Sequence, residues 1–106
     1  MHHGTIERLS VVTKKTVELP ATIDGAVRLM LGLVPEVEQA QIGYMSEEEL
    51  PGLHMRLGQW VRNHLGLWGE NAALMAATGE ENPDDASAVI VRAFWERLRA
   101  DLPRVH

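Results

Sequence analysis

Residues 54–68 read HMRLGQWVRNHLGLW and hold two of the three tryptophans and two of the five histidines of this 106-residue chain. Apolar side chains recur here at intervals of three and four residues, the pattern of a helix with one buried face. Gly66 stands where a left-handed residue closes many helices. The pattern therefore predicts a helix from about Leu53 that ends at Gly66. Its predicted buried face includes His64, as a core imidazole, together with Leu53, Leu57, Trp60, Val61, Leu65 and Trp68.

The residues before this helix predict one short turn followed by a break. Ser46-Glu47-Glu48-Glu49 has the spacing of a capping box, in which Glu49 reaches back to the start of the turn. Pro51 and Gly52 then favour a kink, because proline lacks an amide donor and glycine weakens a helix. We therefore expect the central helix to begin only after them.

Three further helices follow from the same periodicity. The first is expected over residues 23–34 with Thr22 as its N-cap, and the second over residues 35–42. Gly25 and Gly32 inside the first helix indicate either a weak helix or the close approach of another backbone. A short alanine-rich helix is expected over residues 70–78, closed by Gly79.

The last helix has the clearest start signal. Asn82-Pro83-Asp84-Asp85 combines an N-cap, a proline at the first helical position and two carboxylates near the positive helix end. The helix is expected to reach about Leu102. Apolar residues form one broad face, and Val89 and Ala93 lie on the other side. This helix is therefore expected to be covered on both sides.

Residues 1–19 differ in composition and are predicted to form an N-terminal arm. Branched apolar residues flank a polar centre at residues 13–16, which favours β-structure. Because a lone two-stranded hairpin is marginal in water, the arm packs on the helices, pairs with a second copy or stays disordered. Residues 20–106 are predicted to be a single helical domain. The fold class is all-α, a compact bundle of about five helices with an extended or β-like arm.

The composition argues against several classes of function. The chain has no cysteine, which excludes disulfide frameworks, thiol catalysis and cysteine-ligated zinc. Fifteen acidic and ten basic residues give a net charge of −5 without a basic cluster, which argues against nucleic-acid binding. No stretch has the profile of a membrane span or a signal peptide. We expect a cytoplasmic protein without nucleic-acid or membrane partners.

Two motifs carry a family resemblance. One is made by His54, Leu57, Gly58, Trp60, Val61, Arg62, Asn63, Gly66, Leu67 and Trp68, and the other by Pro83, Asp84, Asp85 and Ser87. Together they resemble an uncharacterised family of small bacterial proteins, a domain of unknown function. Its motif is similar to H-x-x-L-G-x-W-I-R-N-x-x-G-L-W followed by H-P-D-D-x-S. The likeness covers roughly residues 19–98 and omits the arm.

The chain departs from that pattern at two positions. Asn82 stands where the family usually has histidine, and Gly25 stands where an acidic residue is common. The first departure weakens any role for position 82 in titration or metal binding. The resemblance implies relatedness to bacterial proteins and assigns no activity.

The candidate polar cluster consists of His54, Arg62, Asn63, Asp84 and Asp85. In one interpretation Arg62 clamps an anion, while His54 or His64 is an acid–base group oriented by an aspartate. In the other, which we favour, Arg62 is a strut that binds Asp84, Asp85 or helix-end carbonyls and ties two helices together. His54, beside the predicted kink, is the better functional candidate of the two histidines. No catalytic residue is assigned.

Neither a metal nor a cofactor is predicted. His54 and His64 are ten residues apart, about 15 Å along a continuous helix, so they cannot share an ion. No glycine-rich phosphate loop and no Gly-x-Ser-x-Gly sequence is present. Trp95 lies at the edge of its apolar stripe and is predicted to be an exposed interface contact.

Two functional hypotheses follow. The leading one is a non-enzymatic protein-interaction module that forms a homodimer, through the arm or the last helix, or binds another protein. The alternative is a small-molecule-binding or anion-binding protein, or a small enzyme, whose polar site gathers His54, Arg62, Asn63 and Asp85.

Overall fold

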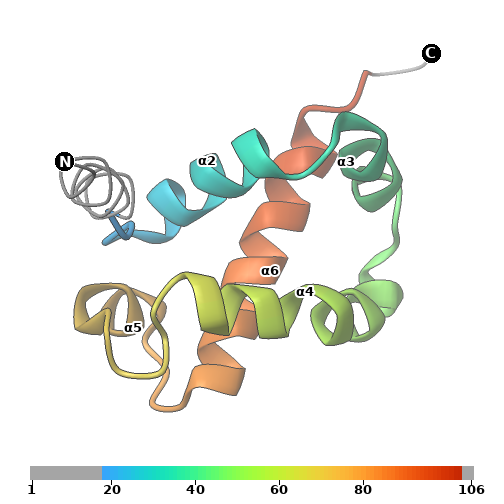
Figure 1. Cartoon of the computed structure of the whole chain (residues 1–106). Helices are drawn as coiled ribbons and strands as arrows, with labels where there is room; N and C mark the ends of the chain where they lie inside the picture. The colour runs from blue at the N-terminus through green and yellow to red at the C-terminus, as the bar shows by residue number, and fades with distance from the viewer. Residues whose placement is uncertain (1–17, 104–106) are drawn as a thin grey trace, which may run out of the picture.

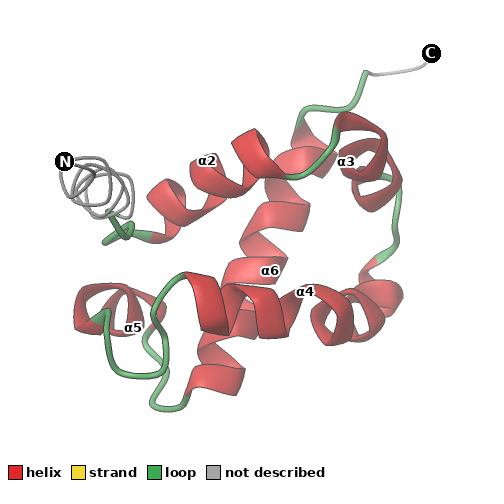
Figure 2. Ribbon diagram, viewed as in Figure 1, coloured by secondary structure: helices red, strands yellow, loops and turns green. Residues whose placement is uncertain are grey.

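The computed structural model describes residues 18–103, and every regular element in this range is helical. The elements are α2 (Ile23–Leu33), α3 (Glu36–Gly43), the 3-10 turn η1 (Glu47–Glu49), α4 (Leu50–His64), α5 (Ala72–Thr78) and α6 (Pro83–Ala100). Figure 2 shows these helices joined by loops. The predicted all-α bundle is confirmed for these residues. The predicted arm lies outside the described residues, apart from Glu18 and Leu19.

The last helix, α6, lies at the centre of the bundle. α2, α3, α4 and α5 all pack against it, and Figure 1 shows α2 and α4 crossing it at separate levels. Its buried apolar residues are spaced three and four positions apart, as in a helix that packs against others. They include Ile90, Phe94 and Leu98. Val89 and Ala93 are half-buried. The apolar side chains of this helix are therefore covered largely by the other helices of the described chain.

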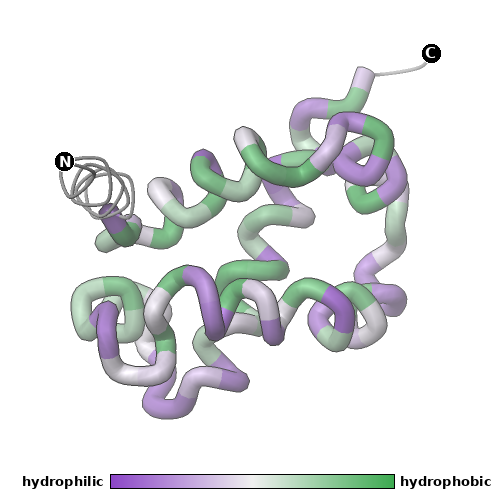
Figure 3. The backbone as a smooth tube through the Cα atoms, in the orientation of Figure 1, coloured by the Kyte–Doolittle hydropathy of each residue, from purple (hydrophilic) through white to green (hydrophobic). Residues whose placement is uncertain are grey.

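The core forms where each surrounding helix turns its apolar side toward α6. Figure 3 shows hydrophobic and hydrophilic residues interspersed along the helices, as expected when each helix buries one side. Met30, Ile42 and Leu53 are among the fully buried side chains, and they come from α2, α3 and α4. The core thus joins all the longer helices into one cluster.

The predicted break at Pro51 and Gly52 is wrong, because α4 begins at Leu50 and runs through both residues. Proline is tolerated in the first turn of a helix, where its missing amide donor has no partner in any case. The turn η1 leads directly into α4. Glu49 does reach back as predicted, and its carboxylate accepts the backbone N–H of Ser46 at 2.9 Å.

The predicted helix ends are confirmed at three places. Thr22 caps α2, and its hydroxyl accepts the N–H of Gly25 at 2.9 Å. Asn82 caps α6, and its side-chain oxygen accepts the N–H of Asp85 at 2.8 Å. Gly66 closes α4 with φ of 79°, in the left-handed region that favours glycine.

The buried side of α4 matches the predicted one only in part: Leu53, Val61 and the following Leu65 are buried as predicted, but Trp68 is 60% exposed, so its predicted burial is wrong. Leu50, Leu53, Gly58 and Val61 are its buried residues, whereas His64 is exposed and stacks on Trp60 with ring centroids 4.7 Å apart. The prediction of His64 as a core imidazole is therefore wrong. The large side chains of the predicted stripe suggested a face centred on Trp60, but α6 packs against the side that carries the small Gly58.

Candidate functional site

The buried hydroxyl of Ser87 joins α4 to the first turns of α6. Arg62 Nη1 donates to Ser87 Oγ at 3.0 Å, and His54 Nε2 lies 2.9 Å from the same oxygen. The Ser87 hydroxyl itself donates to the backbone carbonyl of Asp84 at 2.8 Å. Ser87 is fully buried, so these contacts replace water around its oxygen.

The contacts of Ser87 define the tautomer of His54. A serine hydroxyl has one proton to donate and two lone pairs that accept. Its proton goes to the carbonyl of Asp84, and Arg62 can only donate. Nε2 of His54 must then carry the proton that fills the second lone pair, which leaves Nδ1 of the neutral ring as an acceptor.

Arg62 also forms an ion pair across the same helix junction. Its Nη1 lies 3.1 Å from Asp84 Oδ1, with the arginine side chain 18% exposed and the aspartate 72% exposed. His54 Nε2 lies 4.0 Å from that carboxylate oxygen. Arg62 thus contacts Asp84 and Ser87 through one nitrogen, in the arrangement of a strut rather than of a two-pronged clamp.

Gly58 provides the space in which His54 and Arg62 meet Ser87. His54, Gly58 and Arg62 follow one another at intervals of four residues on α4, so they lie on one face of the helix. A Cβ atom at position 58 would stand 2.5 Å from the ring of His54 and 3.0 Å from Nη1 of Arg62. Any side chain at position 58 would therefore displace both polar groups.

Asn63 and Asp85 do not join this junction. The side-chain oxygen of Asn63 accepts the indole N–H of Trp68 at 2.7 Å, so this asparagine braces the end of α4. Asp85 accepts from the side chain of its N-cap residue, Asn82, at 2.9 Å. Of the five residues predicted as a polar cluster, the structure brings together only His54, Arg62 and Asp84.

The prediction of Trp95 as an exposed contact is wrong. Its side chain is buried, only 5% exposed, and its indole N–H donates to the carbonyl of Met45 at 2.9 Å. The guanidinium groups of Arg92 and Arg99 lie over the ring at 5.7 and 5.2 Å. A residue at the edge of an apolar stripe is exposed only when no other segment covers it. Here the loop before η1 covers Trp95.

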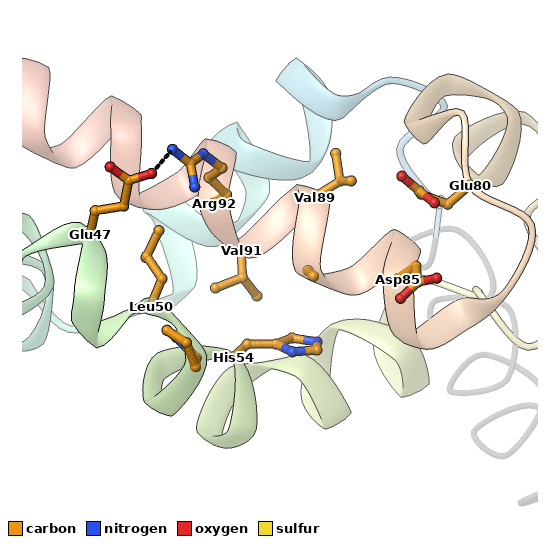
Figure 4. Close-up of a pocket in the computed structure, with 10 residues that line it drawn as sticks. Glu47, Leu50, His54, Glu80, Asp85, Val89, Val91 and Arg92 are labelled. Carbon is orange, nitrogen blue, oxygen red and sulfur yellow. Dashed lines mark hydrogen bonds and ion pairs between the residues drawn. The ribbon is translucent and has the colours of Figure 1, made fainter.

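A pocket of about 600 Å³ lies between α4 and α6, beside the junction. His54 and Asp85 are the only members of the predicted cluster that line it; Arg62 and Asn63 do not. Figure 4 shows the His54 ring in the wall between the apolar side chains and Asp85. The other lining residues are Glu47, Leu50, Pro51, Glu80, Ala88, Val89, Val91 and Arg92.

An ion pair borders one end of the pocket. Arg92 donates to the Glu47 carboxylate at 2.6 Å, shown as a dashed line in Figure 4. The hydrogen bond from Arg92, followed by its positive charge, lowers the pKa of Glu47. The same contacts raise the pKa of Arg92, so both groups are held in their charged forms.

Within the described range, no group of three or more metal-ligating side chains lies close enough to hold an ion. No helix of residues 18–103 is long and apolar enough to cross a membrane. At the junction, the polar side chains of His54, Arg62 and Ser87 bind other side chains or backbone groups.

Sequence reasoning missed two residues that organise the site and a third, outside it, that caps α5. Ser87 and Gly58 belong to the motifs of the resemblance but were given no role. Asn71 was missed altogether. It is buried, donates to the carbonyls of Pro20 and Leu65 at 2.8 and 2.9 Å, and caps α5. The available signal was a glycine four residues from both His54 and Arg62, which indicates a close helix contact.

Comparisons with known proteins identify a family without an assigned biochemical role. Neither a curated protein nor a solved structure matches this chain. One family model matches residues 19–98, which include α2 to α5 and most of α6. Because the match covers well over half of the chain, this protein belongs to the family described as domain of unknown function (DUF6794).

Proposed function

We propose that the domain is a protein-interaction module of the bacterial cytoplasm that self-associates through the outer side of α2 and the start of α3. The observation that carries the proposal is the exposure of Leu33 and Val37, at 57% and 72%, with Leu29 at 38%. The lack of cysteine fits a reducing compartment.

α2 carries exposed apolar residues beside its buried side, and the exposed Asp24–Arg28 ion pair lies opposite that side. Ala26, Val27 and Met30 are buried against the bundle. Leu29 and Leu33, four residues apart, share a side that the described chain leaves open. The apolar stripe of α2 therefore extends beyond its contact with the bundle, which favours a partner for the exposed part.

Gly32 gives this surface room for a second helix. Nothing lies within 4 Å of the position where its Cβ would stand, and the residue is exposed. Two copies of α2 related by a two-fold axis would each present Leu29, Leu33 and a flat glycine to the other, as an isologous contact requires. The proposal replaces the last helix as the predicted interface, because α6 is surrounded by α2 to α5.

Sedimentation velocity on the full chain tests this proposal. We expect a monomer–dimer equilibrium at tens of micromolar. Leu33→Glu should weaken the dimer at least about tenfold, because each copy loses a leucine that the dimer contact would bury. Met55→Glu is the matched control, since Met55 is 83% exposed on α4. A monomer at every concentration, or an equal effect of both variants, would contradict self-association through α2.

A second candidate function, binding of a small ligand, is favoured by the pocket between α4 and α6. Its volume lies within the range of roughly 300–1,000 Å³ that is usual for small-molecule sites. The candidate keeps His54 and Asp85 from the predicted polar site and drops Arg62 and Asn63, which lie outside the pocket. No reaction is proposed for it.

A further inference from the structure

We propose that the pocket between α4 and α6 binds a small organic cation, an amine with a short apolar body. This inference deepens the second candidate function and is independent of self-association. It is based on the charge, the walls and the hydrogen-bonding groups of the pocket.

The charges of the lining residues favour a cation. Glu47, Glu80 and Asp85 contribute three carboxylates, and Arg92 is the one arginine that lines the pocket. Arg92 is engaged by Glu47 at 2.6 Å and by Glu96 at 3.3 Å. Among the described residues, no lysine or arginine forms an ion pair with Glu80 or Asp85. The pocket therefore keeps an excess of negative charge that a ligand can neutralise.

That excess charge lies at one end. Figure 4 shows Glu80 and Asp85 on the side of the pocket away from the Glu47–Arg92 pair. An ammonium group is attracted to two carboxylates and donates hydrogen bonds that they accept. An anion would meet the same carboxylates and find the arginine already paired, so anionic ligands are disfavoured.

Apolar side chains line the space between the two ends. Leu50 and Pro51 come from α4, and Val89 and Val91 come from α6. These groups release water when they contact a hydrocarbon body, which contributes affinity in proportion to the apolar area covered. The ligand that fits is therefore amphipathic, with its cationic group near Asp85.

His54 adds an acceptor to this wall. Its Nε2–H is used by Ser87, and Nδ1 of the neutral ring has no hydrogen-bond partner among residues 18–103. Outside the Glu47–Arg92 pair, the ionisable groups that line the pocket are Glu80, Asp85 and His54, and each of them offers a hydrogen-bond acceptor. A ligand that donates, as an ammonium does, matches them.

Three probes with the same phenyl body separate cation binding from binding of any apolar molecule. They are phenethylamine, 2-phenylethanol and 3-phenylpropanoate, each titrated into the full ¹⁵N-labelled chain and followed by amide chemical shifts. We expect saturable shifts with the amine at the lining residues, at least about tenfold weaker binding of the alcohol, and no saturation with the carboxylate.

Carboxylate variants locate the cation. Glu80→Gln and Asp85→Asn should each weaken binding of phenethylamine about threefold to tenfold. Glu81→Gln is the matched control, because it makes the same charge change at the neighbouring exposed residue, which does not line the pocket. Glu80→Gln is the main test, since Asp85 also bonds to the N-cap of α6.

The outcomes distinguish this inference from the broader ligand-binding function. If the alcohol binds as tightly as the amine, or if Glu81→Gln weakens binding as much as Glu80→Gln, the pocket takes ligands without cation selectivity and the inference is wrong. If no probe produces saturable shifts at the lining residues, both the inference and the second candidate function are wrong.

Discussion

Arg62 of α4 donates from Nη1 to Oδ1 of Asp84 in the first turn of α6, across 3.1 Å. The same nitrogen reaches the buried hydroxyl of Ser87 at 3.0 Å. The two contacts differ in environment, because Asp84 is 72% exposed and Ser87 is fully buried. Water can replace the arginine at Asp84 but not at Ser87, so the second contact should contribute more to stability.

The first prediction separates these contributions. Arg62→Met keeps the apolar stem and removes the guanidinium, and should lower the free energy of unfolding by about 1–2 kcal/mol. Asp84→Asn removes only the exposed partner and should cost less than about 1 kcal/mol. Urea unfolding measures both. An Asp84→Asn variant as destabilised as Arg62→Met would show that the ion pair, and not the contact with Ser87, is dominant.

The second prediction concerns Gly58. Alanine is the better helix former by about 1 kcal/mol, yet Gly58→Ala should destabilise the protein by about 1–2 kcal/mol. The added Cβ would push His54 and Arg62 away from Ser87. Gly52→Ala is the matched control on α4, because nothing lies within 4 Å of its Cβ position, and it should be neutral or stabilising. Thermal or urea unfolding would contradict the close approach at Gly58 if both variants were stabilised.

The third prediction concerns the buried amide of Asn71. Asn71→Asp keeps an oxygen to accept the N–H of Leu74 but replaces the donor that faces the carbonyls of Pro20 and Leu65. A carboxylate against two carbonyls should lower the free energy of unfolding by about 2–4 kcal/mol. Asn71→Ala loses the cap as well, but introduces no charge. The interpretation requires Asn71→Asp to be no more stable than Asn71→Ala in urea unfolding at neutral pH.

The fourth prediction is a pH dependence from Glu47. Arg92 lowers the pKa of this carboxylate in the folded protein, so the unfolded chain binds a proton more readily. The contribution to stability is complete above the unfolded pKa of Glu47 and is lost as the pH falls through the lower folded pKa. Because the pair is exposed, the effect should be small. Glu47→Gln should flatten the stability profile in this acidic window, measured against Glu48→Gln, and identical profiles would contradict the ion pair.

Much of the fold follows from local signals. The caps at Thr22 and Asn82 and the left-handed Gly66 are predicted correctly, because each depends on groups within a few residues in the chain. The break at Pro51 is predicted wrongly, since the same residue type both ends helices and opens them.

The candidate site was predicted only in part. Arg62, Asp84 and His54 do meet, because complementary charges at two helix positions favoured one contact between α4 and α6. Ser87 was missed because a serine in a helix has many roles, and its importance depends on what packs over it. Trp95 was predicted to be exposed because it lies at the edge of the apolar stripe of α6. In the structure the loop at Met45 and two arginines cover that edge.

The sequence by itself determined several of the helix ends, though not the start of α4, and that the helices bury apolar sides, because hydrogen bonds and periodicity act over one or two turns. Only the tertiary structure decided which side of α4 faces α6. Large side chains pointed to one side of that helix, but Gly58 let α6 approach on another, and this rotation moved His54 inward and left His64 in water. Such a choice depends on how closely two helices pack, which is a property of the pair.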